Sequence, residues 1–579
     1  MAPQADLEAE QAYIDRAYEC LEAARSSATR LQSMVEVGRG GTEQARFERE
    51  VIVDTVVNRL SQLQLGDASL CFGRIDLEPA GSGERYYIGR LAVSDETQEP
   101  VVVDWRAPVA EPFYRATGRD PMELARRRHF ATRGRQLLGI EDELFGEHAI
   151  DLGEGAGING QGALISALET ARSGRLTDIV ATIQAEQDEI IRAPLPGVMV
   201  VQGGPGTGKT VVALHRAAYL LYTHRFPLAD QGVLVVGPNR LFLAYIEQVL
   251  PSLGEAGVEL VVLPDLVDDV MVRGGDVPKT GRVKGDARMS KVLAKAVRDR
   301  KRPLRQDLRV GVGLQTLTLG AERSGSIVRD ARRRFRNHNA GRRFVEQEVA
   351  RALAESSRAP IDGSGLWGQI RKHPDVVEAL ERMWPVLTPA QLLHDLFGSR
   401  ALLRLAGAGL LDDHEIEALH RPRSERVGAV VWTRDDVPLL DEARALLGPK
   451  PRKRRRDEDE IRTYGHIVVD EAQDLSPMQL RMLARRSLNG SMTVVGDIAQ
   501  STGAWAHADW SEILTYLPEQ RPARHEELTI GYRIPAPNME LAARVLAASA
   551  PELTPPRSVR QDGRPAARRR RRRHPADGG

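Results

Sequence analysis

Cysteine is almost absent from this 579-residue sequence, in which only Cys20 and Cys71 occur. Two cysteines in so long a chain argue against a disulfide framework and against a cysteine-based metal site. A charge bias is missing as well, because 81 basic and 80 acidic residues give a formal net charge of +1. The composition therefore indicates no global preference for nucleic acid, and any basic surface must be local.

Long apolar runs are also missing. No run of about 18 apolar residues, the length that spans a bilayer, occurs in the sequence. The first residues, "MAPQADLEAEQ", lack the basic flank and apolar core of a signal peptide. We therefore expect a cytoplasmic protein with no membrane partner, long enough for about three to five domains.

The sequence does contain a phosphate-binding loop of the Walker A type. Residues 203–210 read "GGPGTGKT", match G-x-x-x-x-G-K-[ST] in full and follow the valine-rich run 198–201. Glycines let the backbone N–H groups turn inward, and a helix from about Thr210 would direct its positive dipole end at the phosphates. Lys209 would reach the β- and γ-phosphates, and Thr210 would hold Mg²⁺. The candidate nucleotide-binding residues are Gly203, Gly204, Pro205, Gly206, Thr207, Gly208, Lys209 and Thr210.

A carboxylate pair lies far downstream, in "HIVVDEAQDLSPMQLRMLA". The apolar run 467–469 predicts a strand that delivers Asp470 and Glu471 at its carboxyl end, where α/β sheets present ligands. Asp470 is placed to hold Mg²⁺ together with Thr210, and Glu471 to accept a proton from the attacking water. Most Asp-Glu pairs lie on solvated surfaces, but this one follows a strand in a chain that also has a phosphate loop.

Four further residues are candidates because of their order along the chain. Gln187 precedes the loop strand, where its amide would read the edge of adenine. Gln500 follows the buried-looking run "TVVGD" and would sense the γ-phosphate. In "LTIGYRIP", Tyr532 offers a face for the base and Arg533 a cation for transition-state charge.

The N-terminal region predicts a helical hairpin. Ile14, Leu21, Ala28 and Val35 recur every seven residues and form a heptad seam. A second periodic stretch from Phe47 to Leu60 would return along the first helix. Either an antiparallel coiled-coil arm or an ordinary helix pair folded onto a core fits this pattern. The β-rich runs that follow predict a small β-containing module, and helical sequence is expected to resume at about Pro121.

Lys209 and Asp470 lie much further apart than one nucleotide-binding lobe requires, which predicts an inserted domain of roughly 180 residues between them. Its segment 328–344 carries seven arginines interleaved with Phe335 and Phe344. Such a stretch could grip phosphates, but we favour a solvated face balanced by nearby acids.

The order of a glutamine, GxGKT, DEAQD, GDxxQS and YR resembles superfamily 1 helicases of the UvrD type. The resemblance is closer to the HelD family, UvrD-like proteins that bind bacterial RNA polymerase, because of the N-terminal hairpin, "CFGRIDLE", "VVVDWRAPVAEPFY" and "WTRDDVPLLDEA". In that family ATP binding and turnover are linked to removing RNA polymerase from nucleic acid and recycling it. The resemblance implies that the insertion enters the polymerase's main channel and the hairpin its secondary channel.

The C-terminal part departs from that family. Few residues follow Arg533, so we expect a truncated second lobe, and a tail with six arginines at 568–573 is expected to be disordered. The tail is either a functional RNA- or DNA-binding segment or, as we favour, the end of a truncated reading. Besides a polymerase-recycling ATPase, a UvrD-type DNA helicase or translocase and an ATP-binding chain with little turnover remain alternatives.

These observations predict an α/β fold: a RecA-like P-loop NTPase lobe with an N-terminal antiparallel helical arm, a mostly helical insertion and an incomplete second RecA-like lobe. ATP and Mg²⁺ are the expected cofactors. The expected domains are the arm 1–66, the β-containing module 67–150, lobe 1 at 151–264 and 446–520, the insertion 265–445, the start of lobe 2 at 521–552 and the tail 553–579.

Overall fold

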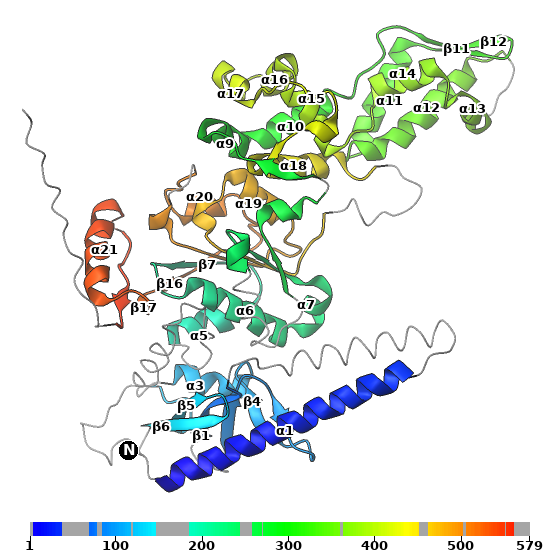
Figure 1. Cartoon of the computed structure of the whole chain (residues 1–579). Helices are drawn as coiled ribbons and strands as arrows, with labels where there is room; N and C mark the ends of the chain where they lie inside the picture. Colours follow the sequence, from blue (N-terminus) through cyan, green and yellow to red (C-terminus); the bar gives the residue numbers. More distant parts are fainter. Residues whose placement is uncertain are drawn as a thin grey trace, which may run out of the picture.

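The computed structural model has a mixed α/β architecture that contains two six-stranded sheets among its described residues. Figure 1 shows an N-terminal β module below, a parallel-sheet domain in the middle and a helical insertion above. None of the described helices is long and apolar enough to cross a bilayer. The described residues are 4–37, 69–77, 84–116, 120–145, 185–243, 258–268, 270–358, 363–450, 461–501, 505–550 and 552–560.

The N-terminal module is a mostly antiparallel sheet with the strand order β3-β4-β2-β1-β5-β6. The helical sequence expected from about Pro121 is wrong, because this part of the chain forms the hairpin β5–β6. The hairpin turns at Gly134, whose φ of +57° suits a glycine, and β5 also pairs with β1. Cross-strand pairing thus overrides the local pattern. The strands are β1 (Cys71–Leu77), β2 (Arg85–Gly89), β3 (Val93–Ser94), β4 (Pro100–Asp104), β5 (Leu124–Arg133) and β6 (Gln136–Leu144).

The first predicted helix is present as α1 (Gln4–Val37), which lies across this sheet and extends past it (Figure 1). Its heptad residue Leu21, together with Ala17 one turn earlier, is buried in one cluster with Val93, Val101 and Val102 of the module. The first half of the seam therefore packs on a β-sheet. The expected second helix, from Phe47 to Leu60, lies outside the described residues.

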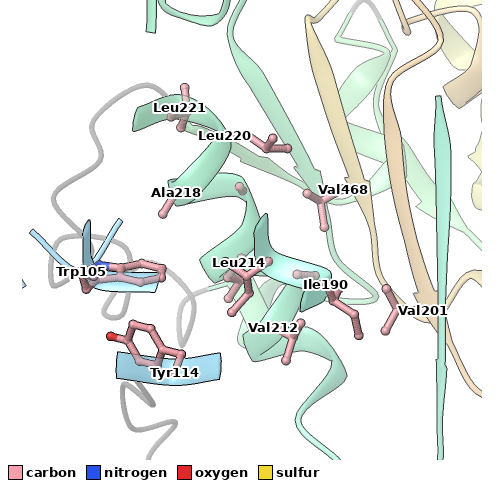
Figure 2. Packing of buried hydrophobic residues seen from close by; sticks show 14 of the residues in the cluster. Trp105, Tyr114, Ile190, Val201, Val212, Leu214, Ala218, Leu220, Leu221 and Val468 are labelled. Carbon is pink, nitrogen blue, oxygen red and sulfur yellow. The ribbon is translucent and has the colours of Figure 1, made fainter. Parts of the chain in front are cut away.

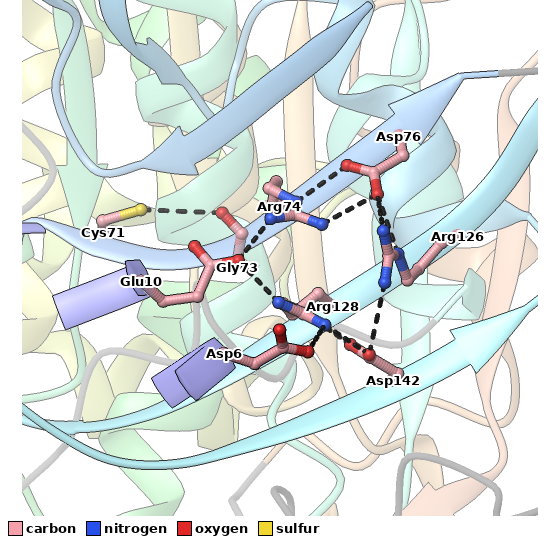
Figure 3. A network of polar contacts seen from close by, with 9 residues as sticks. All are labelled: Asp6, Glu10, Cys71, Gly73, Arg74, Asp76, Arg126, Arg128 and Asp142. Atoms are coloured by element: carbon pink, nitrogen blue, oxygen red, sulfur yellow. Dashed lines mark hydrogen bonds and ion pairs between the residues drawn. The ribbon is translucent and has the colours of Figure 1, made fainter. Parts of the chain in front are cut away.

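A buried polar network fixes α1 to the module (Figure 3). The Glu10 carboxylate is 2% exposed and accepts hydrogen bonds from Arg74 of β1 and, at 2.6 Å, from Arg128 of β5. Arg74 also pairs with Asp76 and Arg128 with Asp142, at 2.7 and 2.6 Å. Burying charges is costly unless they are paired, so these contacts determine where α1 attaches.

The second sheet is wholly parallel, with the order β16-β7-β15-β14-β8-β9. Its central strands are short valine-rich runs that are buried on both faces, as parallel sheets require. Because β16 pairs with β7, this sheet extends past the boundary predicted at residue 520. The strands are β7 (Val198–Gly203), β8 (Val233–Val236), β9 (Val258–Val261), β14 (His466–Val469), β15 (Met492–Gly496) and β16 (Arg524–Leu528).

Helix α6 (Lys209–Thr223) packs between the two sheets (Figure 2). On one side its buried residues meet Trp105 and Tyr114 of the N-terminal module, and on the other Val201 and Val468 of the parallel sheet. All belong to one hydrophobic cluster, so the module and the parallel-sheet domain share a core.

The insertion is mostly helical, as predicted, and contains two separate hydrophobic clusters. The proximal subdomain comprises α9 (Pro278–Gly285), α10 (Arg288–Arg298), α15 (Pro389–Phe397), α16 (Arg400–Gly407), α17 (Asp413–Leu419) and α18 (Val437–Leu447). The distal subdomain comprises β11 (Leu308–Val312), β12 (Gln315–Leu319), α11 (Ala321–Arg334), α12 (Arg342–Glu355), α13 (Gly363–Ile370) and α14 (Pro374–Met383). It lies farthest from the parallel sheet (Figure 1).

A small unit follows the parallel sheet. Strand β17 (Ile530–Gly531) pairs with β18 (Arg557–Ser558), and α21 (Ala536–Ser549) connects them. This is the segment expected to begin a second lobe. The arginine run at 568–573 lies outside the described residues.

The polar network predicts that α1 depends on one carboxylate. Glu10→Ala would leave two buried guanidinium groups without their shared partner, which costs about 3–5 kcal/mol. We expect faster hydrogen exchange along α1 and β1. Arg16→Ala is the matched control, because Arg16 is 56% exposed in its pair with Asp95 and such pairs contribute about 0–1 kcal/mol. Equal exchange in both variants would contradict the anchoring role.

Candidate functional site

The predicted phosphate loop joins the end of β7 to the start of α6. Gly206 and Gly208 have φ angles of +80° and +87°, which are accessible to glycine without strain. Gly208 is also the N-cap of α6, so the loop ends where the helix presents free backbone N–H groups. The sequence pattern and the local backbone thus agree.

The Lys209 ammonium lies over this loop. It donates hydrogen bonds to the Gly203 carbonyl at 2.7 Å and to the Gly204 carbonyl at 3.2 Å. A phosphate oxygen in the loop would offer the same ammonium a charged acceptor, which makes a stronger hydrogen bond than a carbonyl. A phosphate bound in the loop would therefore compete with the Gly203 and Gly204 carbonyls for this ammonium.

A hydrogen bond joins the loop to the distant carboxylate pair. The Thr210 hydroxyl donates to Asp470 Oδ2 at 2.8 Å. Burial raises the pKa of Asp470 to about 6, with Glu471 acting in the same direction, while Thr210 and Lys209 lower it. A hydroxyl and a carboxylate are oxygen donors of the kind that Mg²⁺ prefers, and Mg²⁺ commonly takes its remaining ligands from phosphates and water. The donor set fits this ion.

Glu471 has an unusual backbone, with a φ of +51°. Its N–H donates to Asp470 Oδ1 at 2.9 Å, and its carboxylate accepts a hydrogen bond from Gln473 Nε2 at 2.7 Å. Non-glycine residues in this region are uncommon and cluster at functional sites. The left-handed backbone turns Glu471 away from the strand direction that Asp470 follows.

Two glutamines that the sequence analysis did not single out connect the site. Gln473 Oε1 accepts the Asp497 N–H at 3.2 Å, and Gln202 Nε2 donates to Asp497 Oδ1 at 2.8 Å. Gln202 also accepts the Trp510 indole N–H at 2.9 Å. All are buried, so the ends of β7, β14 and β15 are held together by side-chain hydrogen bonds. The glutamine inside DEAQD was the available signal for Gln473.

Of the remaining predicted residues, Gln187, Tyr532 and Arg533 lie beside glycines of the loop. Gln187 of α5 (Ala185–Arg192) is 2% exposed, and its Nε2 lies 3.5 Å from where a Cβ on Gly208 would be. The Tyr532 N–H donates to the Gly206 carbonyl at 2.9 Å, and Arg533 follows directly at the same glycine. Gln500 is exposed, just after β15.

The β17–β18 unit contacts the loop in two further ways. The Pro556 ring packs on Gly204, 2.7 Å from where a Cβ would lie. The buried Tyr532 hydroxyl has no hydrogen-bond partner among the described residues, and burial, with Glu186 nearby, raises its pKa. An unpaired buried hydroxyl is costly and marks a position where a ligand could supply a partner.

Two family models match the chain. Residues 7–156 match the N-terminal domain of DNA helicase IV HelD, and residues 452–520 match the UvrD/REP helicase N-terminal domain. The matches support the HelD family. They also support the UvrD-like helicase superfamily, as the motif order indicated. No curated protein matches the chain.

The two matched ranges locate the family features. The HelD match includes nearly all of α1 and the complete β module with its polar network, so the anchored helix is part of the family's N-terminal domain. The UvrD/REP match includes Asp470, Glu471 and Gln500. The phosphate loop lies between the matched ranges, and the hydrogen bond between Thr210 and Asp470 is one of its connections to the UvrD-like part.

The loop geometry predicts the effect of removing the ammonium. Lys209→Ala should lower the affinity for a fluorescent ATP analogue by about 1.5–3 kcal/mol, because one charge-assisted contact is lost. Lys291→Ala on the exposed side of α10 is the control and should bind as the parent does. Unchanged affinity of the Lys209 variant would mean that nucleotide binds elsewhere.

Proposed function

We propose that this UvrD-like chain binds Mg-ATP at residues 203–210, hydrolyses it, and uses turnover to release and recycle RNA polymerase. The hydrogen bond between the Thr210 hydroxyl and Asp470 is the observation that supports the binding and hydrolysis of Mg-ATP. It joins a phosphate loop and an acidic pair, which are far apart in the sequence, at one edge of a parallel sheet, where α/β proteins bind ligands.

In this proposal each polar group has one task. Lys209 neutralises the β- and γ-phosphates, while Thr210 and Asp470 hold Mg²⁺. When bound, Mg²⁺ would offset the charge that develops on the phosphate oxygens. Glu471, oriented by Gln473, accepts the proton of the attacking water. Gln187 and Tyr532 contact the base, and Gln500 and Arg533 contact the γ-phosphate.

The polymerase as partner rests on the HelD match and on the shape of α1. The matched domain carries a long helix whose first half is anchored and whose second half extends past the sheet. On that second half Leu31 is 53% exposed, which suits a surface that contacts another protein. The UvrD/REP match favours a second candidate, an ATP-dependent DNA translocase.

Hydrolysis tests the role of Glu471. Glu471→Gln removes the proton acceptor but keeps a similar shape, so phosphate release should fall by about 10²- to 10⁴-fold while ATP affinity stays within about twofold. Glu519→Gln, an exposed carboxylate, is the control. Phosphate release by the Glu471 variant at the parent's rate would refute the assignment of the base.

Binding to RNA polymerase tests the second part of the proposal, the contact made by α1. Leu31→Glu should weaken capture of purified RNA polymerase by about tenfold, since a charge replaces an apolar contact in an interface. Leu488→Glu changes a 50% exposed leucine in the parallel-sheet domain and should have no effect. If the parent binds forked DNA but no polymerase, the translocase becomes the better proposal.

A further inference from the structure

The distal subdomain carries a dense group of arginines. Residues 329–343 include seven arginines and one acid, Asp330. Six of these arginines are exposed, and we call them the distal arginine face: Arg329, Arg332, Arg333, Arg334, Arg336 and Arg343. They lie on α11, at its end and at the start of α12.

The expected balance by nearby acids is not found for this face. Only Arg342, which is buried, forms ion pairs in this segment, with Glu346 at 2.7 Å and Glu381 at 2.9 Å. None of the six exposed arginines has an ion pair within the described part of the chain. Three other exposed arginines of the subdomain, Arg323, Arg351 and Arg382, do pair with a glutamate.

Packing brings these arginines together. The Phe335 and Phe344 rings lie 5.6 Å apart and join the end of α11 to the start of α12. The Arg334 guanidinium covers the Phe344 ring at 4.9 Å. Arg332 donates hydrogen bonds to the carbonyls of Arg298 and Lys301, so the basic loop after α10 adjoins the same face.

Cations near this face contribute to the pKa shifts of two neighbouring groups, although burial is the largest cause of both shifts. Burial, with Arg332 nearby, lowers the pKa of Lys301. Burial lowers the pKa of His338 to about 4, and Lys301, Arg300 and Arg342 act in the same direction. Like charges held close together oppose folding, so a bound polyanion would relieve the repulsion among the six exposed arginines, which have no ion pair among the described residues.

The types of side chain exposed on this face indicate which kind of polyanion it would bind. Every large apolar side chain that the structure describes in residues 321–344 is buried or half-buried. A membrane or an apolar protein interface would require exposed apolar anchors here. Exposed guanidinium groups match phosphates, which they bind as planar forks.

We propose that the distal arginine face binds the phosphate backbone of nucleic acid. Such contacts carry no base sequence information, so the face would hold a strand in place without selecting a sequence. The distal subdomain has its own hydrophobic cluster, remote from the phosphate loop, so this binding does not depend on the proposed ATP hydrolysis.

The test compares two triple variants of the full chain. The side chains of Arg333, Arg336 and Arg343 have no hydrogen bond or ion pair with other described residues, so changing all three to alanine removes charge but no such side-chain interaction. The control changes Arg323, Arg351 and Arg382 to alanine, three exposed arginines of the same subdomain that have glutamate partners. Both variants lose the same charge, and both keep residues 568–573.

Binding is measured by fluorescence anisotropy with 20-nucleotide oligo(dT), oligo(U) and a duplex, over a range of salt. The face variant should bind about 10- to 100-fold more weakly at low salt, with a salt slope reduced by about 2–3, and the control should resemble the parent. The thermal stability of the face variant should be unchanged or higher, because repulsion is removed. The Lys209→Ala background should show the same difference, which separates this proposal from the ATP site.

Three results would overturn the proposal. The first is equal affinity and equal salt slope for the two triple variants. The second is binding to phosphatidylserine vesicles that exceeds binding to oligonucleotides and is lost in the face variant, which would assign the face to a membrane. The third is competition by polyglutamate as effective, per charge, as oligo(dT), which would assign it to an acidic protein.

Discussion

Parallel pairing of β7, β15 and β14 is the constraint on which the candidate site depends. It places the carboxyl ends of these three strands at one edge, so that the phosphate loop, Asp497 and the Asp470–Glu471 pair meet there although the helical insertion separates them in the sequence. Buried Gln202 and Gln473 then hold the three ends together. The insertion can be large because it leaves and rejoins the sheet without interrupting a strand.

The sequence predicted well the parts that local patterns encode. The valine runs, the loop glycines and the strand before Asp470 are where they were expected, because a buried parallel strand and a Walker A loop both have strong local signatures. The heptads of α1 correctly predicted a helix. They did not reveal its partner, since the same apolar spacing serves a coiled coil and a β-sheet surface.

The features that the sequence did not reveal depend on strand pairing and ion pairs between residues that are far apart in the chain. The stretch 124–144 is rich in arginine. It forms strands because β1 pairs with it and because the buried carboxylates of Asp76 and Glu10 neutralise two of its cations. Likewise, β16 could not be assigned to the first sheet without knowing that β7 offered it an edge. The arginines of the distal arginine face were expected to have acidic partners, and only the tertiary arrangement shows that none of them forms an ion pair within the described residues.

The position of α6 has a mechanical consequence. The helix begins at the phosphate loop, and its buried Arg216 donates hydrogen bonds to four carbonyls between Ile190 and Pro194, in the link from α5 to β7. The ring of the preceding residue, His215, lies 5.7 Å from the ring of Trp105 of the N-terminal module. Helix α6 is therefore held on one side by the segment between α5 and β7 and on the other by the N-terminal module. A displacement at the loop would be passed on as a tilt of the module, and the far end of α1 would magnify it because a long helix amplifies a small rotation at its base.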